Sequence, residues 1–315
     1  MVTVRRALIL ALALLGSGAS AQEPPALPFV GGEFDQDAIL ERMSPTFVRE
    51  LRQIGTSSVT LRADLAAVRV AFKPRTDLHP RGYLAELAAY RVAPALGLDN
   101  VPPVRAVRLG RAIMRQRFRS DHAEDWPPIE AAIRWDEGAT TRGAAIYWIP
   151  AMRPSELATD AGLDAHTPWL RLDGEVPEGA EGVARDLSTM LAFDYLIANW
   201  DRFSGGNVST TAEGDRLFVR DHNVAFGQLV PGRYARLRET LERTQRFSRG
   251  FVARLAALDE VALRASLAPE SEALGGRSVL DDAQLAAFLA RRRALLSYVA
   301  ALVAVHGAER VLVWE

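Results

Sequence analysis

The sequence predicts an α+β fold of two lobes, a small sheet-rich N-terminal lobe followed by a mainly helical C-terminal lobe. Before residue 150, apolar and polar residues alternate in short runs, as they do in β-strands with one buried face. After it, apolar residues recur every three or four positions, as in amphipathic helices. No internal repeat breaks this order. A cleft between two such lobes is a common place for a ligand.

The first residues have the pattern of a secretory signal peptide. Arg5 and Arg6 precede an apolar run of nine residues, and Ala19-Ser20-Ala21 is a small-x-small cleavage site. The run is too short to span a bilayer, so we expect cleavage, no stable membrane anchor afterwards, and a periplasmic or secreted bacterial protein. The expected divisions are a signal peptide at 1–21, a lead-in segment at 22–44, the N-terminal lobe at 45–150 and the C-terminal lobe at 151–315.

The N-terminal lobe is expected to contain helices and hairpins in alternation. Ile39, Met43 and Leu51 belong to an apolar pattern of helical spacing that predicts a first helix over 35–54. A polar turn at 55–58 and a hairpin of strands at 59–65 and 67–72 are expected next, followed by a helix at 82–93. The rest of the lobe is expected to consist of a second hairpin of strands at 104–109 and 112–118, an inserted polar loop at 120–142 and a strand at 144–149.

The C-terminal lobe is expected to be helical apart from one short strand. A helix over 182–200 is the clearest element, because Leu187, Met190 and Leu191 fall on one apolar face. Expected around it are a loop at 154–182, a glycine-bearing loop at 199–207, a strand at 217–219, and further helices beyond 231 that end in a long apolar helix at 281–305.

The composition excludes several classes of function. The chain has 315 residues, of which 49% are hydrophobic and 24% charged, as is typical of a globular protein with a sizeable core. Its 38 basic and 39 acidic residues nearly cancel, so no strong field favours nucleic acid as a partner. Cysteine is absent, which excludes disulfides, a thiolate nucleophile and a metal site built on cysteine.

A single lysine, Lys73, stands among 37 arginines. A chain so rich in arginine keeps a lysine by chance, or where a compact ammonium is needed that a planar guanidinium cannot replace. Lys73 ends a predicted strand, and Glu86 lies in the helix that follows. Glu86 is surrounded in sequence by leucine and alanine, so it is either on a solvated helix face or buried with a cation as its partner.

Two loops of the C-terminal lobe carry further polar groups. Asp201 and Asn207 flank a Gly-Gly pair, and Asp221 follows a short apolar strand. Each of them alone could be a turn former or a cap. In order along the chain, however, a lysine, a helical glutamate, an Asp…Asn loop and a final aspartate are the groups that phosphoryl transfer from ATP requires. Carboxylate and amide oxygens also suit Mg²⁺ or Mn²⁺.

Other chemistries have weaker support. The five histidines lack a metal-ligand spacing such as His-x-x-x-His, and no Gly-x-Ser-x-Gly elbow is present. Four tryptophans could line a substrate groove, although we expect them to serve in core or loop packing; they are Trp126, Trp135, Trp148 and Trp169.

These motifs resemble those of the atypical kinases of the secretory pathway, the Golgi casein-kinase, xylose-kinase and four-jointed group. More distantly they are similar to the phosphatidylinositol kinases and the Hip toxin kinases. The resemblance covers roughly residues 45 to 230 and rests on Ala-Phe-Lys73-Pro, Arg-Gly-Tyr-Leu-Ala-Glu86, the segment from Asp194 to Arg202, and Asp221-His222. The resemblance implies a protein-kinase-like fold in which Lys73 binds phosphate and Glu86 pairs with Lys73. It also implies that Asp201 is the catalytic acid/base and that Asn207 and Asp221 hold the metal. The loop over the phosphates would consist of Gly55, Thr56, Ser57 and Ser58.

The sequence departs from the family pattern in four ways. The phosphate loop has one glycine, and Asp201 and Asn207 are one residue further apart than is usual. Phe203 stands where the family has a histidine, and the cysteine pairs of the animal secreted members are missing. Three functions therefore stay open. The first is an exported ATP-dependent kinase acting on a hydroxyl acceptor, a protein Ser/Thr or a sugar. The alternatives are a pseudokinase that binds a nucleotide or a partner, and a nucleotidyl transferase on the same fold.

Overall fold

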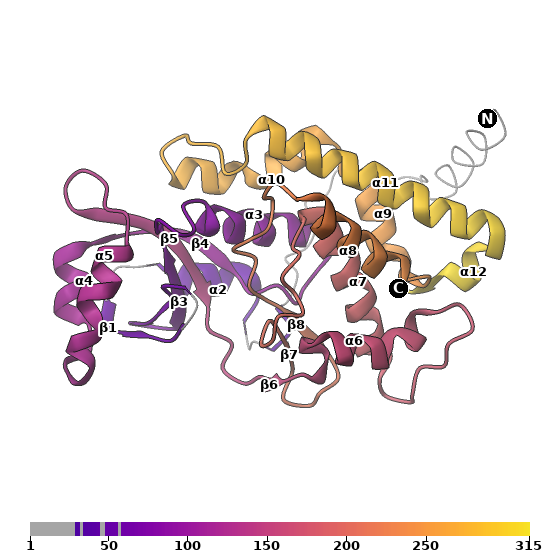
Figure 1. Ribbon diagram of the computed structural model, residues 1–315, viewed down its shortest axis with the longest axis horizontal. Helices are drawn as coiled ribbons and strands as arrows, with labels where there is room; N and C mark the ends of the chain where they lie inside the picture. The colour runs from indigo at the N-terminus through magenta and orange to yellow at the C-terminus, as the bar shows by residue number, and fades with distance from the viewer. Residues whose placement is uncertain (1–28, 32–33, 45–47, 56–57) are drawn as a thin grey trace.

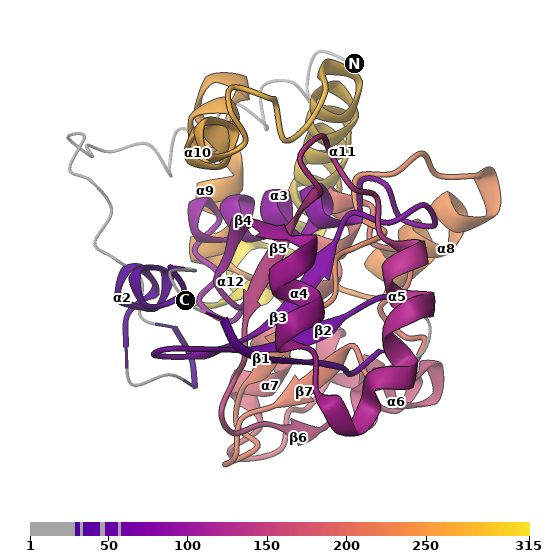
Figure 2. The same ribbon diagram turned by 90° about the vertical axis from the view of Figure 1, so that its left-hand side faces the viewer.

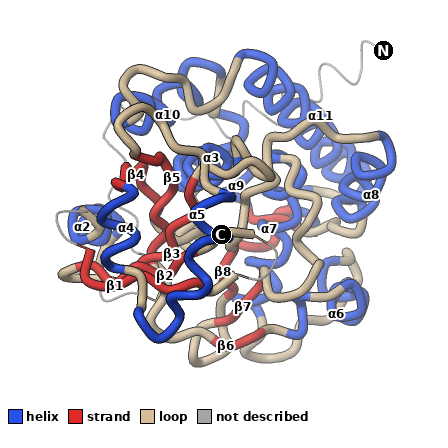
Figure 3. Tube along the Cα trace, turned by 60° about the vertical axis from the view of Figure 1, so that its left-hand side comes forward, coloured by secondary structure: helices blue, strands red, loops and turns tan. Residues whose placement is uncertain are grey.

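The computed structural model describes residues 29–31, 34–44, 48–55 and 58–315 (Figure 1). The predicted signal peptide and two residues of the predicted phosphate loop, Thr56 and Ser57, lie outside the described residues. Within these ranges the chain forms a sheet-rich first lobe and a helical second lobe, as expected (Figures 1 and 3). The boundary between the lobes at residue 150 stays a prediction.

The first lobe is built on a five-stranded antiparallel sheet with the strand order β1-β2-β3-β5-β4. The two faces of this sheet belong to different cores, because alternate residues of β5 point to opposite sides. Ala144 and Ile146 pack with α3, whereas Ala145 and Tyr147 pack on the side of α4 and α5. The elements are β1 (Val48–Gln53), β2 (Leu61–Leu65), β3 (Arg69–Pro74), α3 (Gly82–Ala95), β4 (Val104–Gly110), α4 (Arg111–Arg117), α5 (Trp126–Ala132) and β5 (Thr140–Tyr147).

The predicted helix over 35–54 is wrong in its second half. A short helix, α2 (Gln36–Arg42), is followed by strand β1. The register of β1 against β2 shifts between Val48 and Glu50, and the residues of β1 that are buried are Val48 and Leu51. A bulged strand thus buries residues three apart, and this spacing resembles that of a helix.

The second predicted hairpin is also wrong, because only its first strand forms. Strand β4 ends at Gly110, and the next residues form α4, in which Met114 is the buried residue. The sequence of α4, Arg-Ala-Ile-Met-Arg-Gln-Arg, is rich in helix formers. The partner of β4 is β5, which comes much later in the chain. The first hairpin, β2 with β3, and helix α3 are confirmed.

Two segments predicted as loops contain short helices. Pro127 and Pro128 lie in the first turn of α5, where a helix does not need their missing N–H groups. Thr159 caps α6 (Asp160–His166) by accepting a hydrogen bond from the N–H of Gly162. Short 3₁₀ turns complete these segments, at Ser120–Asp125, Glu156–Ala158 and Thr167–Leu170.

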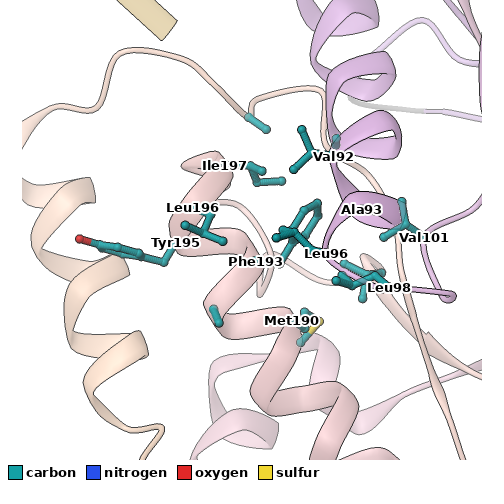
Figure 4. Close-up of a cluster of buried hydrophobic side chains, with 14 of the residues drawn as sticks. Val92, Ala93, Leu96, Leu98, Val101, Met190, Phe193, Tyr195, Leu196 and Ile197 are labelled. Atoms are coloured by element: carbon teal, nitrogen blue, oxygen red, sulfur yellow. The ribbon is translucent and has the colours of Figure 1, made fainter. Parts of the chain in front are cut away.

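The second lobe is organised around α7 (Glu181–Ile197), which is buried along most of its length. Val92 of α3 and Leu96, the residue that follows this helix, gather with Met190 and Phe193 of α7 in one buried cluster that joins the lobes (Figure 4). The predicted C-terminal helices are confirmed. The remaining elements are β6 (Arg153–Pro154), β7 (Val208–Thr210), β8 (Leu217–Val219), α8 (Pro231–Glu242), β9 (Phe247–Ser248), α9 (Arg249–Ala257), α10 (Glu260–Ala273), α11 (Asp282–His306), α12 (Ala308–Val311) and β10 (Leu312–Trp314).

Strands β6, β7 and β8 form a small antiparallel sheet in the second lobe. The loop from α7 to β7 and the loop after β8 carry the polar residues singled out above, Asp201, Asn207 and Asp221. In the described part of the chain, no helix is both long enough and apolar enough to cross a membrane.

Candidate nucleotide and phosphoryl-transfer site

Lys73, near the end of β3, is held between two carboxylates. Its Nζ donates to Glu86 Oε1, in α3, at 2.6 Å and to Asp221 Oδ1, after β8, at 2.7 Å. The side chain of Lys73 is 12% exposed and that of Glu86 is 1% exposed, whereas that of Asp221 is 39% exposed. The ammonium therefore joins a fully buried carboxylate to one that solvent can reach.

Burial and charge act against each other in this cluster. Burial lowers the pKa of Lys73, but the carboxylates of Glu86 and Asp221 outweigh this effect and raise that pKa. Burial likewise raises the pKa of Glu86, but the Lys73 ammonium and His222 outweigh it and bring that pKa down to about 2. Both groups are therefore charged at neutral pH, and the lysine is a fixed cation.

His222 covers the buried side of this cluster. Its backbone N–H donates to Glu86 Oε1 at 3.1 Å, and its Nδ1 lies 3.4 Å from Glu86 Oε2. Its ring packs edge-on against Phe193 of α7, with the ring centroids 5.9 Å apart. Glu86 thus has donors around it from β3 and from the loop after β8, as a buried carboxylate requires.

The backbone turns sharply at Asp221, which has a φ of +61°. Side chains other than glycine seldom adopt this left-handed conformation, although aspartate tolerates it better than most. The turn lets the Asp221 carboxylate meet Lys73 while the next N–H meets Glu86. Such a conformation persists only where the surrounding contacts hold it, and it is common at functional sites.

A buried arginine, Arg202, ties together the two loops that carry the predicted catalytic and metal-binding residues. It is 1% exposed and binds Asp194 of α7 through Nε and Nη2, both at 2.8 Å. Its Nη1 donates to the carbonyl of Asn207 at 3.1 Å and also to the carbonyl of Arg220. One guanidinium therefore fixes the end of α7, the loop after it and the end of β8 relative to one another.

Asp201 and Asn207, at the two ends of one loop, are brought together. Asn207 Nδ2 donates to the carbonyl of Asp201 at 2.9 Å and to Ser204 Oγ at 3.3 Å. Gly205 and Gly206 have φ values of +101° and +79°. This glycine turn takes up the extra residue of the loop. Among the described residues, no hydrogen bond or ion pair engages the side-chain carboxylate of Asp201.

A cleft of about 310 Å³ opens beside Lys73 and Asp221. It combines these charges with apolar surface, as a site for a flat base and a chain of phosphates must. Trp148, the residue after β5, lines this cleft, which agrees with the groove-lining role that the sequence left open for it. The other side chains that line its apolar part include Ile54, Ala71, Ile146, Ile149 and Met152.

The described residues of the predicted phosphate loop, Gly55 and Ser58, line the same cleft between β1 and β2. The single glycine is required by space, because a Cβ at Gly55 would lie 2.6 Å from the carbonyl oxygen of Ser58. The carbonyl of Gly55 accepts from Gln53 Nε2 at 2.8 Å. The loop therefore has a defined shape at both of its described ends.

The donors near Asp221 suit a divalent metal that shares its coordination with phosphates. Asp221 offers a partly exposed carboxylate, and Asn207 uses only its Nδ2 in the hydrogen bonds above, so its Oδ1 can still act as a ligand. Mg²⁺ is typically held by one or two protein oxygens together with substrate phosphates. In the described residues, no group of three or more histidine or acidic side chains is placed to hold a metal.

Together these observations define a class of fold, the two-lobed kinase-like fold of the atypical secretory-pathway kinases. No protein-family model matches the sequence, and a sequence search of curated proteins finds no significant match. The fold class is therefore assigned from the three-dimensional structure.

Three of the solved structures that match this chain illustrate the shared fold. The Golgi casein kinase matches with a TM-score of 0.63 at 15% sequence identity, over 88% of this chain and 77% of that chain. The structure of the Golgi casein kinase with Mn/ADP bound matches with a TM-score of 0.63 at 14% sequence identity, over 88% of this chain and 78% of that chain. Hydra Fam20, solved with sugar, matches with a TM-score of 0.63 at 18% sequence identity, over 86% of this chain and 90% of that chain. The predicted fold is thus confirmed, and at these identities the similarity concerns the fold.

Proposed function

We propose that the protein is an exported ATP-dependent kinase that transfers the γ-phosphoryl group to a hydroxyl acceptor, a protein Ser/Thr or a sugar. The observation that carries this proposal is the position of Lys73, the only lysine of the chain, between Glu86 and Asp221 at the cleft. Phosphoryl transfer needs a fixed cation at the phosphates and a carboxylate for the metal. A shared fold with a kinase solved with Mn/ADP supports the use of nucleotide and metal.

Each residue of the site has a role in this proposal. Lys73 donates from Nζ to phosphate oxygens of ATP, and Glu86 holds Lys73 in place. Asp221 and Asn207 would hold Mg²⁺ or Mn²⁺, which neutralises phosphate charge when it is bound. Asp201 accepts the proton of the acceptor hydroxyl as that oxygen attacks. Gly55 and Ser58, which line the cleft, would lie beside the phosphates.

Export of the enzyme is a separate part of the proposal. It is supported by the charged start, the apolar run and the small-x-small site within residues 1–21. If it is correct, the acceptor is met outside the cytoplasm, in the periplasm or the medium.

The masses of the reaction products test the proposed chemistry. The chain is incubated with ATP and Mg²⁺ or Mn²⁺, with a serine-rich protein or a sugar as acceptor, and the chain and acceptor are both weighed. Phosphoryl transfer adds about 80 Da per site and adenylyl transfer about 329 Da. We expect the smaller increment. The larger increment would assign nucleotidyl transfer, and metal-dependent nucleotide binding without any adduct would assign a pseudokinase.

A further inference from the structure

A buried glutamate behind helix α3 joins three parts of the fold. Glu270, in α10, is 2% exposed, and its carboxylate accepts three hydrogen bonds. Arg91 of α3 donates to Oε1 from Nε at 3.1 Å and from Nη2 at 2.7 Å. The backbone N–H of Ala106, in the edge strand β4, donates to Oε2 at 2.9 Å. The carboxylate of Glu270 thus links α10 to α3, the helix that carries Glu86, and to the edge of the sheet.

Arg91 and Glu86 point in different directions from α3. They are five residues apart, which corresponds to about 140° around an α-helix. Glu86 meets Lys73 at the cleft, whereas Arg91 meets α10. Figure 2 shows α3 between the sheet strands β4 and β5 and the C-terminal helix α10. For α3 to rotate or slide, it must break its bonds to Glu270.

Polar contacts cross this corner of the molecule beside the apolar packing of α3 against α10. A cavity of about 210 Å³ lies there, and Leu40, Arg91, Arg105 and Glu270 are among the residues that line it. Arg105 Nη1 crosses the corner to the carbonyl of Leu40, in α2, at 2.9 Å. The three hydrogen bonds of Glu270 add a directional restraint on the outer side of α3 to these apolar contacts.

We propose that Glu270 is a positioning residue. By binding Arg91 and Ala106, it holds α3 where Glu86 can engage Lys73. The placement of the corresponding helix is a point of control in protein kinases. Here the restraint comes from Glu270, a residue of the same chain. The effect of Glu270 on phosphoryl transfer rests on the proposed function, but its effect on the position of α3 and on the Lys73–Glu86 pair does not.

The single lysine allows a test that needs no knowledge of the acceptor. An amine-reactive reagent modifies only Lys73 and the N-terminus of the chain, and mass spectrometry of peptides gives the rate at Lys73. The Lys73 side chain is 12% exposed while Glu86 and Asp221 both hold it, so loss of the bond to Glu86 leaves the amine freer to reach the reagent. Glu270→Gln and Arg91→Met are therefore expected to raise the labelling rate of Lys73 above that of the wild-type chain, and Arg91→Lys to raise it less.

Turnover is the second readout of the same variants. Misplacement by about 1 Å far from the reacting atoms can cost about 100-fold in rate. We therefore expect Glu270→Gln and Arg91→Met to lower kcat for phosphoryl transfer by about 10- to 100-fold, with a smaller change in KM for ATP. A variant that carries both Glu270→Gln and Arg91→Met is expected to lose no more kcat than the more affected single variant, because both substitutions break the same contact between Arg91 and Glu270.

Arg292→Met is the matched control. Arg292 Nε and Nη2 donate to the carbonyls of Leu255 and Ala256 at 2.8 Å and 2.6 Å and so join α11 to α9, and neither bond involves a residue of α3. The Arg292→Met substitution removes two hydrogen-bonded arginine N–H donors, as Arg91→Met does. It is expected to lower the unfolding temperature, while the labelling rate of Lys73 and kcat stay unchanged.

Two results would overturn the proposal: unchanged Lys73 labelling in folded Glu270→Gln and Arg91→Met variants, or equal acceleration in Arg292→Met. A wild-type chain that transfers no phosphate, but whose Lys73 labelling responds as expected, would leave the positioning role intact and refute the proposed function.

Discussion

Lys73→Ala and Lys73→Arg are both expected to lower phosphoryl transfer by about 10²- to 10³-fold, as the loss of one preorganised donor at a transition state does. Alanine removes the cation and leaves the buried carboxylate of Glu86 without its ammonium. Arginine keeps the charge, but a planar guanidinium cannot take the place of a compact ammonium that bonds two carboxylates at 2.6 and 2.7 Å. The measurement is kcat/KM for ATP, with the fold checked by circular dichroism.

Arg69→Ala is the control for these variants. Arg69 lies in the same strand, and its side chain is 60% exposed. This substitution is expected to leave kcat/KM unchanged. A fully active Lys73→Arg variant would show that any cation suffices at this position, and a fully active Lys73→Ala variant would refute the assignment of the site.

Asp201→Asn is expected to lower kcat by about 10²- to 10⁴-fold, the contribution typical of a general base. Asparagine cannot take a proton from the acceptor hydroxyl. The bond from Asn207 to this residue uses the backbone carbonyl, so the loop should keep its shape in the variant. The affinity for ATP should change little, because Asp201 acts on the acceptor. Single-turnover kinetics and calorimetric titration with ATP separate the two effects.

Asp164→Asn provides a comparison on the surface. Asp164 is 65% exposed and pairs with Arg243 away from the cleft, so its loss is expected to leave both kcat and ATP affinity unchanged. A wild-type kcat in Asp201→Asn would mean that the acceptor hydroxyl loses its proton to another group. The proposed role of Asp201 would then be wrong.

The elements that the sequence predicted correctly are those whose signal is local. Helix α7 has an apolar face over its whole length, and the hairpin of β2 and β3 alternates cleanly. Strand β1 was missed because its bulge spaces the buried residues Val48 and Leu51 like those of a helix. Strand β4 was given the wrong partner, because its pairing with β5 depends on residues 30 or more positions away.

The same distinction holds for the site. The pair of Lys73 and Glu86 was predicted through the family resemblance, because the sequence alone left Glu86 either solvated or buried beside a cation, and the structure shows the pair. The role of Arg202 was missed. Its partners include the backbone carbonyls of Asn207 and Arg220, and no side-chain pattern marks these. The available signal was Asp194, an acidic residue inside an apolar helix, which needs a cation when it is buried.

The most direct test of a nucleotide site at Lys73 and Asp221 is the thermal stability of the chain with ATP plus Mg²⁺ or Mn²⁺, measured beside Asp221→Ala. A ligand that binds the native state at about 100-fold above its Kd stabilises it by about 2.7 kcal/mol. We predict a rise in unfolding temperature that requires both ATP and metal and is lost in Asp221→Ala. No rise with either metal, or an equal rise in the variant, would contradict a nucleotide site at these residues.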